Sequence, residues 1–298
     1  MKIAFVTQTY REDYNECLLL CKSIDRFAPA EIKHYLFVND EDYGLFLHLK
    51  SERREVLKKS VIIPKWLKKF PIKLFGHTVW VSPFTIPVRG WIIQQVCKLG
   101  VFKVIKDADV FLNFDSETVL MKPFAPDIFV CDDKLRLFET DTSSEPKQKQ
   151  YYEAVSKILH LPLSTAQQYT FMCMPVGFRR DILEQLTTRI GQYNFLKSWK
   201  LVLFNKLRFS ENYLYACFVK QHIGIDESCH FLSNEIPFPV IRITGNSNVE
   251  ELKSSIYKLF QNEKVYGFCL QKGGKRATIS IKPEDYISVI QELWEQQK

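Results

Sequence analysis

Short apolar runs alternate with amphipathic segments in the first part of the chain. Three of the apolar runs are typical of buried strands: residues 2–8, 34–40 and 55–64, the last ending at a proline. Between them, residues 13–28 have the apolar spacing of an amphipathic helix that ends before Pro29, and residues 42–50 begin another helix. Strands that alternate with helices predict a largely parallel sheet covered by helices on both faces.

A further helix and strand follow a proline-rich loop at residues 71–87. Residues 89–105 predict a helix whose apolar face carries Ile92, Val96 and Leu99. Its other face gathers Trp91, Gln94, Gln95 and Lys98. The next strand, residues 108–115, is apolar on both faces, as expected of a central parallel strand.

The second half of the chain has a less regular pattern. Residues 135–141 predict a strand, and the polar segment 143–153 reads as a loop or the start of a helix. Residues 169–186 predict a strand, a turn at Pro175 and Gly177, and a helix. A helix capped by Ser210 is expected at 209–221. The chain then predicts a glycine-rich turn at 272–275, a strand at 277–281 and a closing helix at 283–294. Without repeats or a clear linker, residues 1–298 are expected to form one α/β domain.

Two carboxylates, Asp115 and Glu117, follow the strand at 108–115 directly. Side chains at i and i+2 of an extended chain leave the backbone on one side, so both acids converge if the strand geometry persists. Converging carboxylates repel each other unless they face water or share a cation, and Mg²⁺ or Mn²⁺ prefers such oxygen ligands. A polar turn that closes the strand is the alternative reading of an isolated D-x-E.

Composition indicates a globular chain with a large core, since 46% of its 298 residues are apolar. The eight cysteines form no C-x-x-C pair or zinc spacing, which favours reduced thiols and a cytoplasmic protein. No run reaches the roughly 18 apolar residues of a membrane span. The net charge is +7, and the lysine-rich segment 58–75 contains no acid. This segment is a candidate for peripheral contact with an anionic membrane or an acidic substrate, or else a solvated loop.

Several common motifs are absent from the sequence. It contains no G-x-G-x-x-G, no G-x-x-x-x-G-K-[ST] and no G-x-S-x-G, which disfavours a Rossmann dehydrogenase, a P-loop NTPase and an α/β-hydrolase. The lysine patch has no nucleic-acid recognition motif either. Chemistry is therefore expected at the acidic doublet.

Three motifs in order along the chain carry a family resemblance: GWIIQQVCKL at 90–99, VFLNFDSETVLMKP at 110–123 and FSENYLY at 209–215. Here the sequence resembles the GT-A-fold nucleotide-sugar glycosyltransferases, in particular a bacterial glycosyltransferase-like family. Glu117 departs from the family pattern, which commonly has Asp at this position. The resemblance implies a Rossmann-type mixed sheet, with residues 1–125 binding the nucleotide sugar and 126–298 binding the acceptor.

The resemblance also implies an activity and its cofactor. A metal-dependent enzyme with Mn²⁺ or Mg²⁺ would move a sugar from a nucleotide-diphosphate donor to a hydroxyl of a bacterial surface polysaccharide or its lipid-linked precursor. Asp115 and Glu117 are the expected metal ligands, with His230 or His222 as a third. Glu211, at a helix start, is the expected general base of an inverting displacement.

Donor-binding roles follow for further residues. Arg89 and Lys98 are expected at the diphosphate, with Gln94 and Gln95 at sugar or phosphate oxygens. The base and ribose pocket is assigned to Thr7, Thr9, Asp40 and Asp115.

Two other function classes remain open from the sequence. A sugar-phosphate nucleotidyltransferase also uses metal-bound acids on an α/β fold, but it needs a glycine-rich loop, and residues 7–13 contain no glycine. A nucleotide-sugar-binding module of the same fold without turnover is suggested by the change from Asp to Glu at 117.

Overall fold

The computed structural model describes residues 1–72, 78–141, 146–162, 169–193, 195–272, 281–282 and 284–296. Of the predicted elements, the glycine-rich turn beyond Lys272, the strand at 277–281 except Ile281, and the first residue of the closing helix lie outside the described residues.

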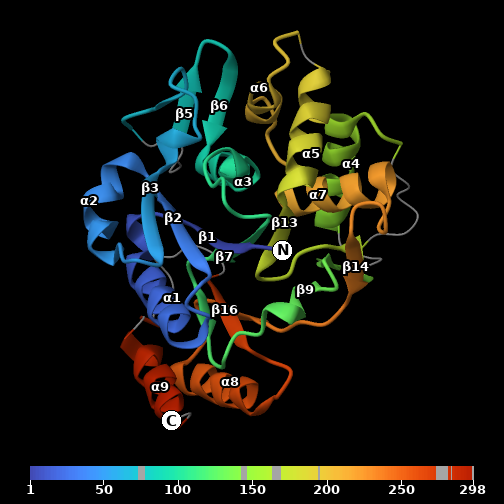
Figure 1. Ribbon diagram of the computed structural model, residues 1–298. Helices are drawn as coiled ribbons and strands as arrows, with labels where there is room; N and C mark the ends of the chain where they lie inside the picture. The colour runs from blue at the N-terminus through green and yellow to red at the C-terminus, as the bar shows by residue number, and fades with distance from the viewer. Residues whose placement is uncertain are drawn as a thin grey trace.

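A five-stranded sheet forms the centre of the molecule, in the order β13-β7-β1-β2-β3 (Figure 1). Four of its strands are parallel: β1 (Ile3–Thr9), β2 (Lys33–Val38), β3 (Arg54–Lys58) and β7 (Val110–Asp115). The edge strand β13 (Val176–Arg179) runs antiparallel to β7. The predicted largely parallel α/β architecture is confirmed.

Helices cover both faces of this sheet. Residues of α1 (Tyr14–Phe27), α8 (Val249–Gln261) and α9 (Glu284–Glu295) share one apolar core with Phe5. The other core contains Ala4 and Val6. It also takes in α3 (Gly90–Gly100), α4 (Pro146–Leu159), α5 (Arg180–Gln192), α6 (Trp199–Phe204) and α7 (Glu211–Phe218). Odd-numbered residues of β1 thus face α1, and even-numbered ones face α3, because strand side chains alternate.

Smaller sheets extend this framework. One has the order β15 (Val240–Ile243), β16 (Gly267–Lys272) and β8 (Thr118–Leu120), and a second has the order β14 (His230–Ser233), β10 (Lys134–Phe138) and β9 (Val130–Cys131). A third pairs β11 (Thr140–Asp141) with β12 (Tyr169–Thr170). The fourth has the order β4 (Lys68–Lys69), β5 (Val79–Ser82) and β6 (Thr85–Arg89). The short helix α2 (Tyr43–Phe46) follows β2, and a π-helix (Val219–Ile223) follows α7.

Most predicted elements are present, with three corrections. The predicted loop at 71–87 contains most of the β5–β6 hairpin, and its proline at 87 is tolerated because β6 is an edge strand. The third strand ends at Lys58 and continues as a 3₁₀ turn instead of reaching Pro64. Gly177 lies inside β13, where a Cβ would come within 2.9 Å of a Leu135 methyl, so close packing explains this glycine.

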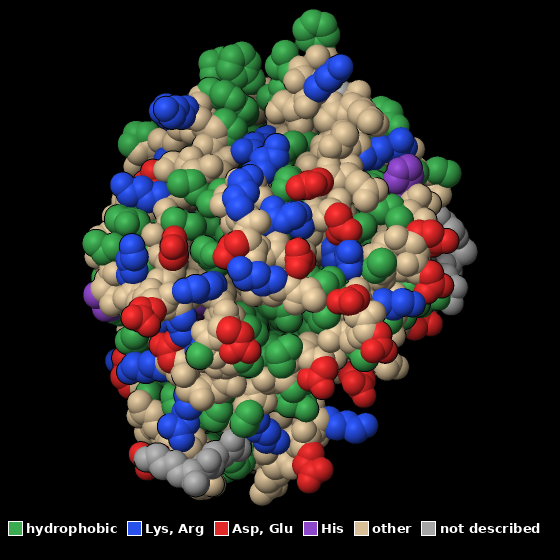
Figure 2. Space-filling view, in the orientation of Figure 1, with side chains coloured by type: hydrophobic (Ala, Val, Ile, Leu, Met, Phe, Trp, Pro, Cys, Tyr) green, Lys and Arg blue, Asp and Glu red, His purple; other side chains and the backbone are tan. Residues whose placement is uncertain are grey.

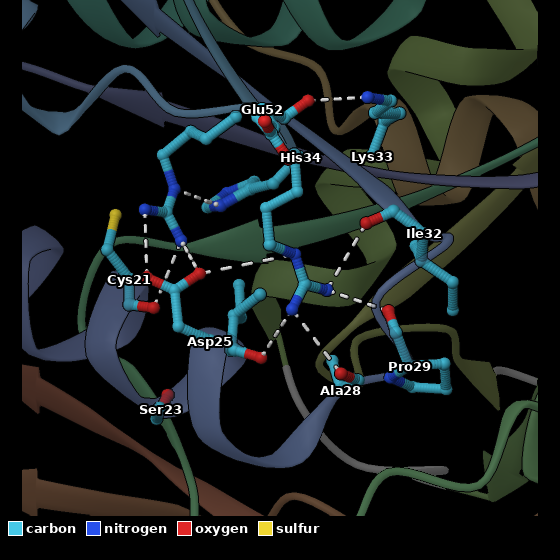
Figure 3. Close-up of polar contacts among 12 residues, drawn as sticks. Cys21, Ser23, Asp25, Ala28, Pro29, Ile32, Lys33, His34 and Glu52 are labelled. Atoms are coloured by element: carbon cyan, nitrogen blue, oxygen red, sulfur yellow. Dashed lines mark hydrogen bonds and ion pairs between the residues drawn. The ribbon is translucent and has the colours of Figure 1, made fainter.

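Two arginines fix α1 against β2 (Figure 3). Arg53 donates hydrogen bonds to main-chain carbonyls at and beyond the end of α1: those of Ile24, Ala28, Pro29 and Ile32. Arg54 donates to both carboxylate oxygens of Asp25, at 2.7 and 3.2 Å, and to Nδ1 of His34 at 3.0 Å.

The neighbouring His34 is neutral, and both of its ring nitrogens are hydrogen-bonded in this network. Because Nδ1 accepts from Arg54, the ring proton is on Nε2 and is donated to the Thr7 hydroxyl at 3.1 Å. Burial lowers the pKa of His34, and the charges of Arg54 and Arg53 lower it further. The Thr7 hydroxyl is therefore already hydrogen-bonded in the interior, on the α1 side of the sheet.

All eight cysteines are free thiols, as predicted. Among the described residues, the helices are too short or too polar to cross a membrane.

Gly267 should be essential for the pairing of β16 with β8. A Cβ at this position would lie 2.2 Å from the Val119 carbonyl oxygen and 2.5 Å from the Phe238 ring. We expect Gly267→Ala to lower the free energy of unfolding by about 1–3 kcal/mol, measured by denaturant titration. Gly44→Ala, where nothing lies within 4 Å, is the control. Equal stability of the two variants would contradict this packing.

Candidate active site

A cleft of about 1520 Å³ lies over the carboxyl edge of the parallel strands. Gln8 and Tyr10 from the end of β1, and Asn39 from the end of β2, line it. The start of α3 contributes Arg89, Gly90, Trp91 and Gln94, and α4 contributes Gln150, Tyr151 and Lys157. The volume exceeds the roughly 300–1,000 Å³ of an ordinary small-ligand pocket.

Positive charge predominates in the cleft. Its basic residues outnumber the acidic ones: Arg11, Lys59, Lys69, Arg89, Lys157, Lys206 and Arg208 against Glu12, Glu41, Asp42 and Glu153. The side chains of Arg89, Lys157 and Lys206 make no ion pair or hydrogen bond with described residues. These cations are available to an anionic ligand.

The side-chain amide of Gln8 is also available to a ligand. Its side chain is 3% exposed and lines the cleft, and neither amide atom has a hydrogen-bond partner among the described residues. An unpaired buried amide costs free energy, which a bound ligand with both a donor and an acceptor would recover.

Asp115 and Glu117 lie at the end of the strand next to Gln8, and neither of them lines the cleft. Asp115 ends β7 and pairs in register with Gln8 of β1, while Glu117 lies in the turn between β7 and β8. The two acids therefore approach each other across a turn and not along an extended strand. Burial raises the pKa of Glu117 to about 8, and the negative charge of Asp115 raises it too.

Lys98 forms a buried bridge between two carboxylates. Its ammonium group lies 2.9 Å from Oδ1 of Asp115 and 3.1 Å from Oε1 of Glu211. Burial acts to lower the pKa of Lys98, but the two carboxylates outweigh it, so the pKa is raised and the lysine stays charged. The bridge joins α3 to the end of β7 and to the start of α7.

Glu211 is enclosed by the same contacts. Its side chain is 4% exposed, and its main-chain N–H donates to Oε1 of Gln95 at 2.9 Å. Gln95 and Lys98 are three residues apart, on one face of α3 turned toward α7. Neither Glu211 nor Gln95 lines the cleft. This placement gives no support to the general-base role expected of Glu211, because its carboxylate already holds Lys98.

The other expected donor-binding residues divide between the two faces of the sheet. Arg89 and Gln94 line the cleft. Thr7 and Thr9 are fully buried, Thr7 bonds His34, and Asp40 is exposed and accepts a hydrogen bond from the Ser60 N–H. Neighbours one position away in sequence line the cleft in their place: Gln8, Tyr10, Asn39 and Glu41. Strand alternation is the signal for this, but only the fold shows which face is open.

The two histidines considered as a third ligand lie apart from the acids. His230 is buried, with Nε2 bonded to the Tyr215 hydroxyl and Nδ1 to Ser228, and burial lowers its pKa to about 4. The Tyr215 hydroxyl accepts from the N–H of Arg179, which pairs with Val110 at the opposite end of β7 from Asp115.

His222 is exposed, with its ring 5.0 Å from that of Phe218. The structure does not bring either histidine together with Asp115 and Glu117.

Two neighbouring carboxylates fit a hard divalent cation in part. No group of three or more His, Cys, Asp or Glu side chains suited to a metal occurs within the described ranges. Mg²⁺ in phosphate-handling sites is often held by only one or two carboxylates, with substrate phosphates and water completing its shell. Asp115 and Glu117 supply such a donor set once Glu117 has lost the proton that its raised pKa retains.

Fold and site together define an α/β protein with a basic cleft at the carboxyl edge of its sheet and an acidic pair beside it. The chain belongs to a family of unknown function, DUF6492, whose sequence model matches residues 2–270. Comparison with curated proteins finds no match.

Two solved structures are similar to this chain over nearly its whole length. An active-site mutant of LgtC gives a TM-score of 0.49 at 11% identity, covering 97% of this chain and 95% of that one. The apo structure of WbbM, a bifunctional glycosyltransferase, gives a TM-score of 0.44 at 11% identity, covering 99% of this chain and 51% of that one. The chain thus spans about half of the WbbM chain.

The raised pKa of Glu117 makes stability depend on pH. The folded protein keeps this proton up to about pH 8, whereas an unfolded glutamate releases it near pH 4.5, so the wild type loses stability as pH rises through this window. We expect Glu117→Gln to match the wild-type Tm near pH 4.5 and to exceed it increasingly toward pH 8. A constant difference in Tm between the two proteins across this range would contradict the assignment.

Removal of Lys98 should leave two buried carboxylates without a counter-charge. We expect Lys98→Met to lower the free energy of unfolding by about 3–5 kcal/mol, measured by denaturant titration. Lys103→Met, at an exposed position close by, should stay within about 0.5 kcal/mol of the wild type. Adding Glu211→Gln to Lys98→Met should restore part of the loss, and a further additive loss would argue against the bridge.

Proposed function

We propose that this protein is a metal-dependent glycosyltransferase. It transfers a sugar from a nucleotide-diphosphate donor to a hydroxyl of a glycan or a lipid-linked saccharide. The observation that carries the proposal is the large cleft with unpaired cations and an acidic pair at the carboxyl edge of a parallel sheet. The sequence motifs at 90–99, 110–123 and 209–215 support the same class.

The donor diphosphate is assigned to the start of α3. Helix N-termini attract anions because their first N–H groups have no partner within the helix, and here Gly90 and Trp91 line the cleft, although the Gly90 N–H already donates to the Thr78 carbonyl at 3.3 Å. Arg89 precedes the helix and has a free guanidinium, which suits a bidentate bond to phosphate. Gln94, one turn further on, reaches the same space.

The nucleotide is assigned to the ends of β1 and β2. The unpaired amide of Gln8 matches a base edge that presents both a donor and an acceptor. Tyr10 and Asn39 flank it in the cleft. This assignment replaces the Thr7 and Thr9 pocket expected from the sequence, because those side chains face α1.

Asp115 and Glu117 would hold the cation. When bound, Mn²⁺ or Mg²⁺ supplies positive charge that stabilises the departing diphosphate. Lys98 fixes the Asp115 carboxylate, and Glu211 in turn holds Lys98, so both are positioning residues.

An acceptor sugar is assigned to the aromatic wall formed by α3 and α4. The Trp91 ring lies 6.4 Å from that of Tyr151, and both line the cleft. Trp91 is 38% exposed, which leaves its apolar face open to the C–H groups of a sugar ring. Residues 1–125 thus carry the donor and 126–298, with Trp91, the acceptor.

Thermal-shift screening with UDP-, GDP-, CMP- and dTDP-compounds, with and without Mn²⁺, tests this function. We expect one nucleotide sugar to raise the Tm only with the metal, and slow donor hydrolysis to release free sugar. Asp115→Asn and Glu117→Gln should each lower hydrolysis by at least about 100-fold. Asp127→Asn, at an exposed site outside the cleft, should have no effect.

Two outcomes would contradict glycosyl transfer. Metal-dependent binding of a nucleotide sugar with no turnover in the wild type would identify a binding module, which the engagement of Asp115 by Lys98 favours. Release of pyrophosphate from a nucleoside triphosphate and a sugar phosphate would identify a nucleotidyltransferase instead.

A further inference from the structure

Two turns and the segment just after α6, at one end of the molecule, carry highly exposed apolar side chains. In the connection between α5 and α6, Phe195 is 98% and Leu196 60% exposed; Phe84, in the β5–β6 turn, is 57% exposed; and Leu207, just after α6, is 78% exposed. Three of the four most exposed large apolar residues in the described part of the chain belong to this group. We name Phe84, Phe195, Leu196 and Leu207 the apolar tip.

The tertiary structure brings these turns to the same end. The Asn205 side chain, at the end of α6, donates to the Phe84 carbonyl at 3.1 Å and accepts from the Ile86 N–H at 3.1 Å. In Figure 1 the β5–β6 turn and the α5–α6 connection both point to the top of the view, on either side of α6. Figure 2 shows hydrophobic side chains projecting at this edge.

The three segments that carry or adjoin the apolar tip contain basic residues and no acid. The segments 58–72, 78–89 and 195–208 include no Asp or Glu. Lys65, Lys197 and Arg208 are exposed within them. Lys65 adjoins Trp66, whose ring lies 5.7 Å from that of Phe84. A surface with projecting apolar groups and only positive charge is complementary to an anionic, apolar partner.

We propose that the apolar tip docks the protein on an anionic lipid bilayer, with its aromatic and aliphatic side chains in the interfacial region and the lysines on lipid headgroups. Apolar groups on separate turns enter a fluid interface readily, and basic side chains beside them add attraction to acidic lipids. The charge of this end, without a single acid in its three segments, favours a bilayer over a second copy of this chain, whose matching surface would repel it.

This surface differs from the linear segment expected from the sequence. Within 58–72, Lys59 is buried and bonds the Thr9 carbonyl and Asn39, and Lys69 pairs with Glu41 in the cleft. The docking surface is instead assembled from three segments distant in sequence.

Docking at this end would place the mouth of the cleft beside the bilayer. Asn205, Lys206, Leu207 and Arg208 follow α6 and also line the cleft. A substrate held in the membrane would therefore reach the cleft without leaving the lipid surface. The docking surface itself does not depend on the proposed glycosyl transfer, and it is tested without donor or metal.

Cosedimentation of the full chain with vesicles tests the docking surface. We expect binding to phosphatidylcholine vesicles that contain phosphatidylglycerol, weak binding to pure phosphatidylcholine, and loss of binding at about 0.5 M salt. The triple variant Phe84→Ser, Phe195→Ser, Leu196→Ser should bind at least about tenfold more weakly at an unchanged Tm.

The matched control changes exposed apolar residues elsewhere. Leu232→Ser, Ile236→Ser and Val240→Ser, at side chains 46–51% exposed on and between β14 and β15, should leave vesicle binding unchanged. Lys65→Gln with Lys197→Gln should weaken binding mainly at low salt. Absence of wild-type binding to acidic vesicles, an equal loss in the control variant, or a tip-dependent dimer without vesicle binding would each overturn the proposal.

Discussion

The bridge that Lys98 makes between Asp115 and Glu211 is the contact on which the site depends. A lysine 4% exposed is stable with its charge only because two carboxylates lie within about 3 Å of its ammonium group. Those carboxylates come from the end of β7 and the start of α7, so one side chain of α3 joins the two halves of the molecule. This bridge fixes the position of the Asp115 carboxylate.

The alternation of side chains along β1 then decides what the cleft contains. Thr7 points to α1 and bonds His34, while Gln8 points to α3 and keeps both amide atoms unpaired. Asp115 lies in register with Gln8 on the same side of the sheet. A free amide, an acidic pair, a helix N-terminus and unpaired cations thus lie along one edge of the sheet, and the proposed nucleotide-sugar donor rests on this combination.

Prediction from sequence succeeded where the pattern was local and strong. The strands at 2–8 and 108–115 and the helix at 89–105 are present, since their apolar runs and periodicity leave few alternatives. It failed where a partner strand decides the structure. The β5–β6 hairpin contains two prolines and reads as a loop, and Gly177 reads as a turn although it packs inside β13 against Leu135.

The α/β class, the parallel strands and the position of Asp115 and Glu117 at a strand end can be read from the amino-acid sequence alone, because they follow from periodicity and chain order. The face of β1 that opens to the cleft, the buried pairing of Lys98 with Glu211 and the place of His230 at the far end of β7 became known only from the folded chain. The folded chain also places Phe84, Phe195 and Leu207 at one end of the molecule. Burial and pairing depend on contacts between distant segments, and a pattern along the chain carries no information about those contacts.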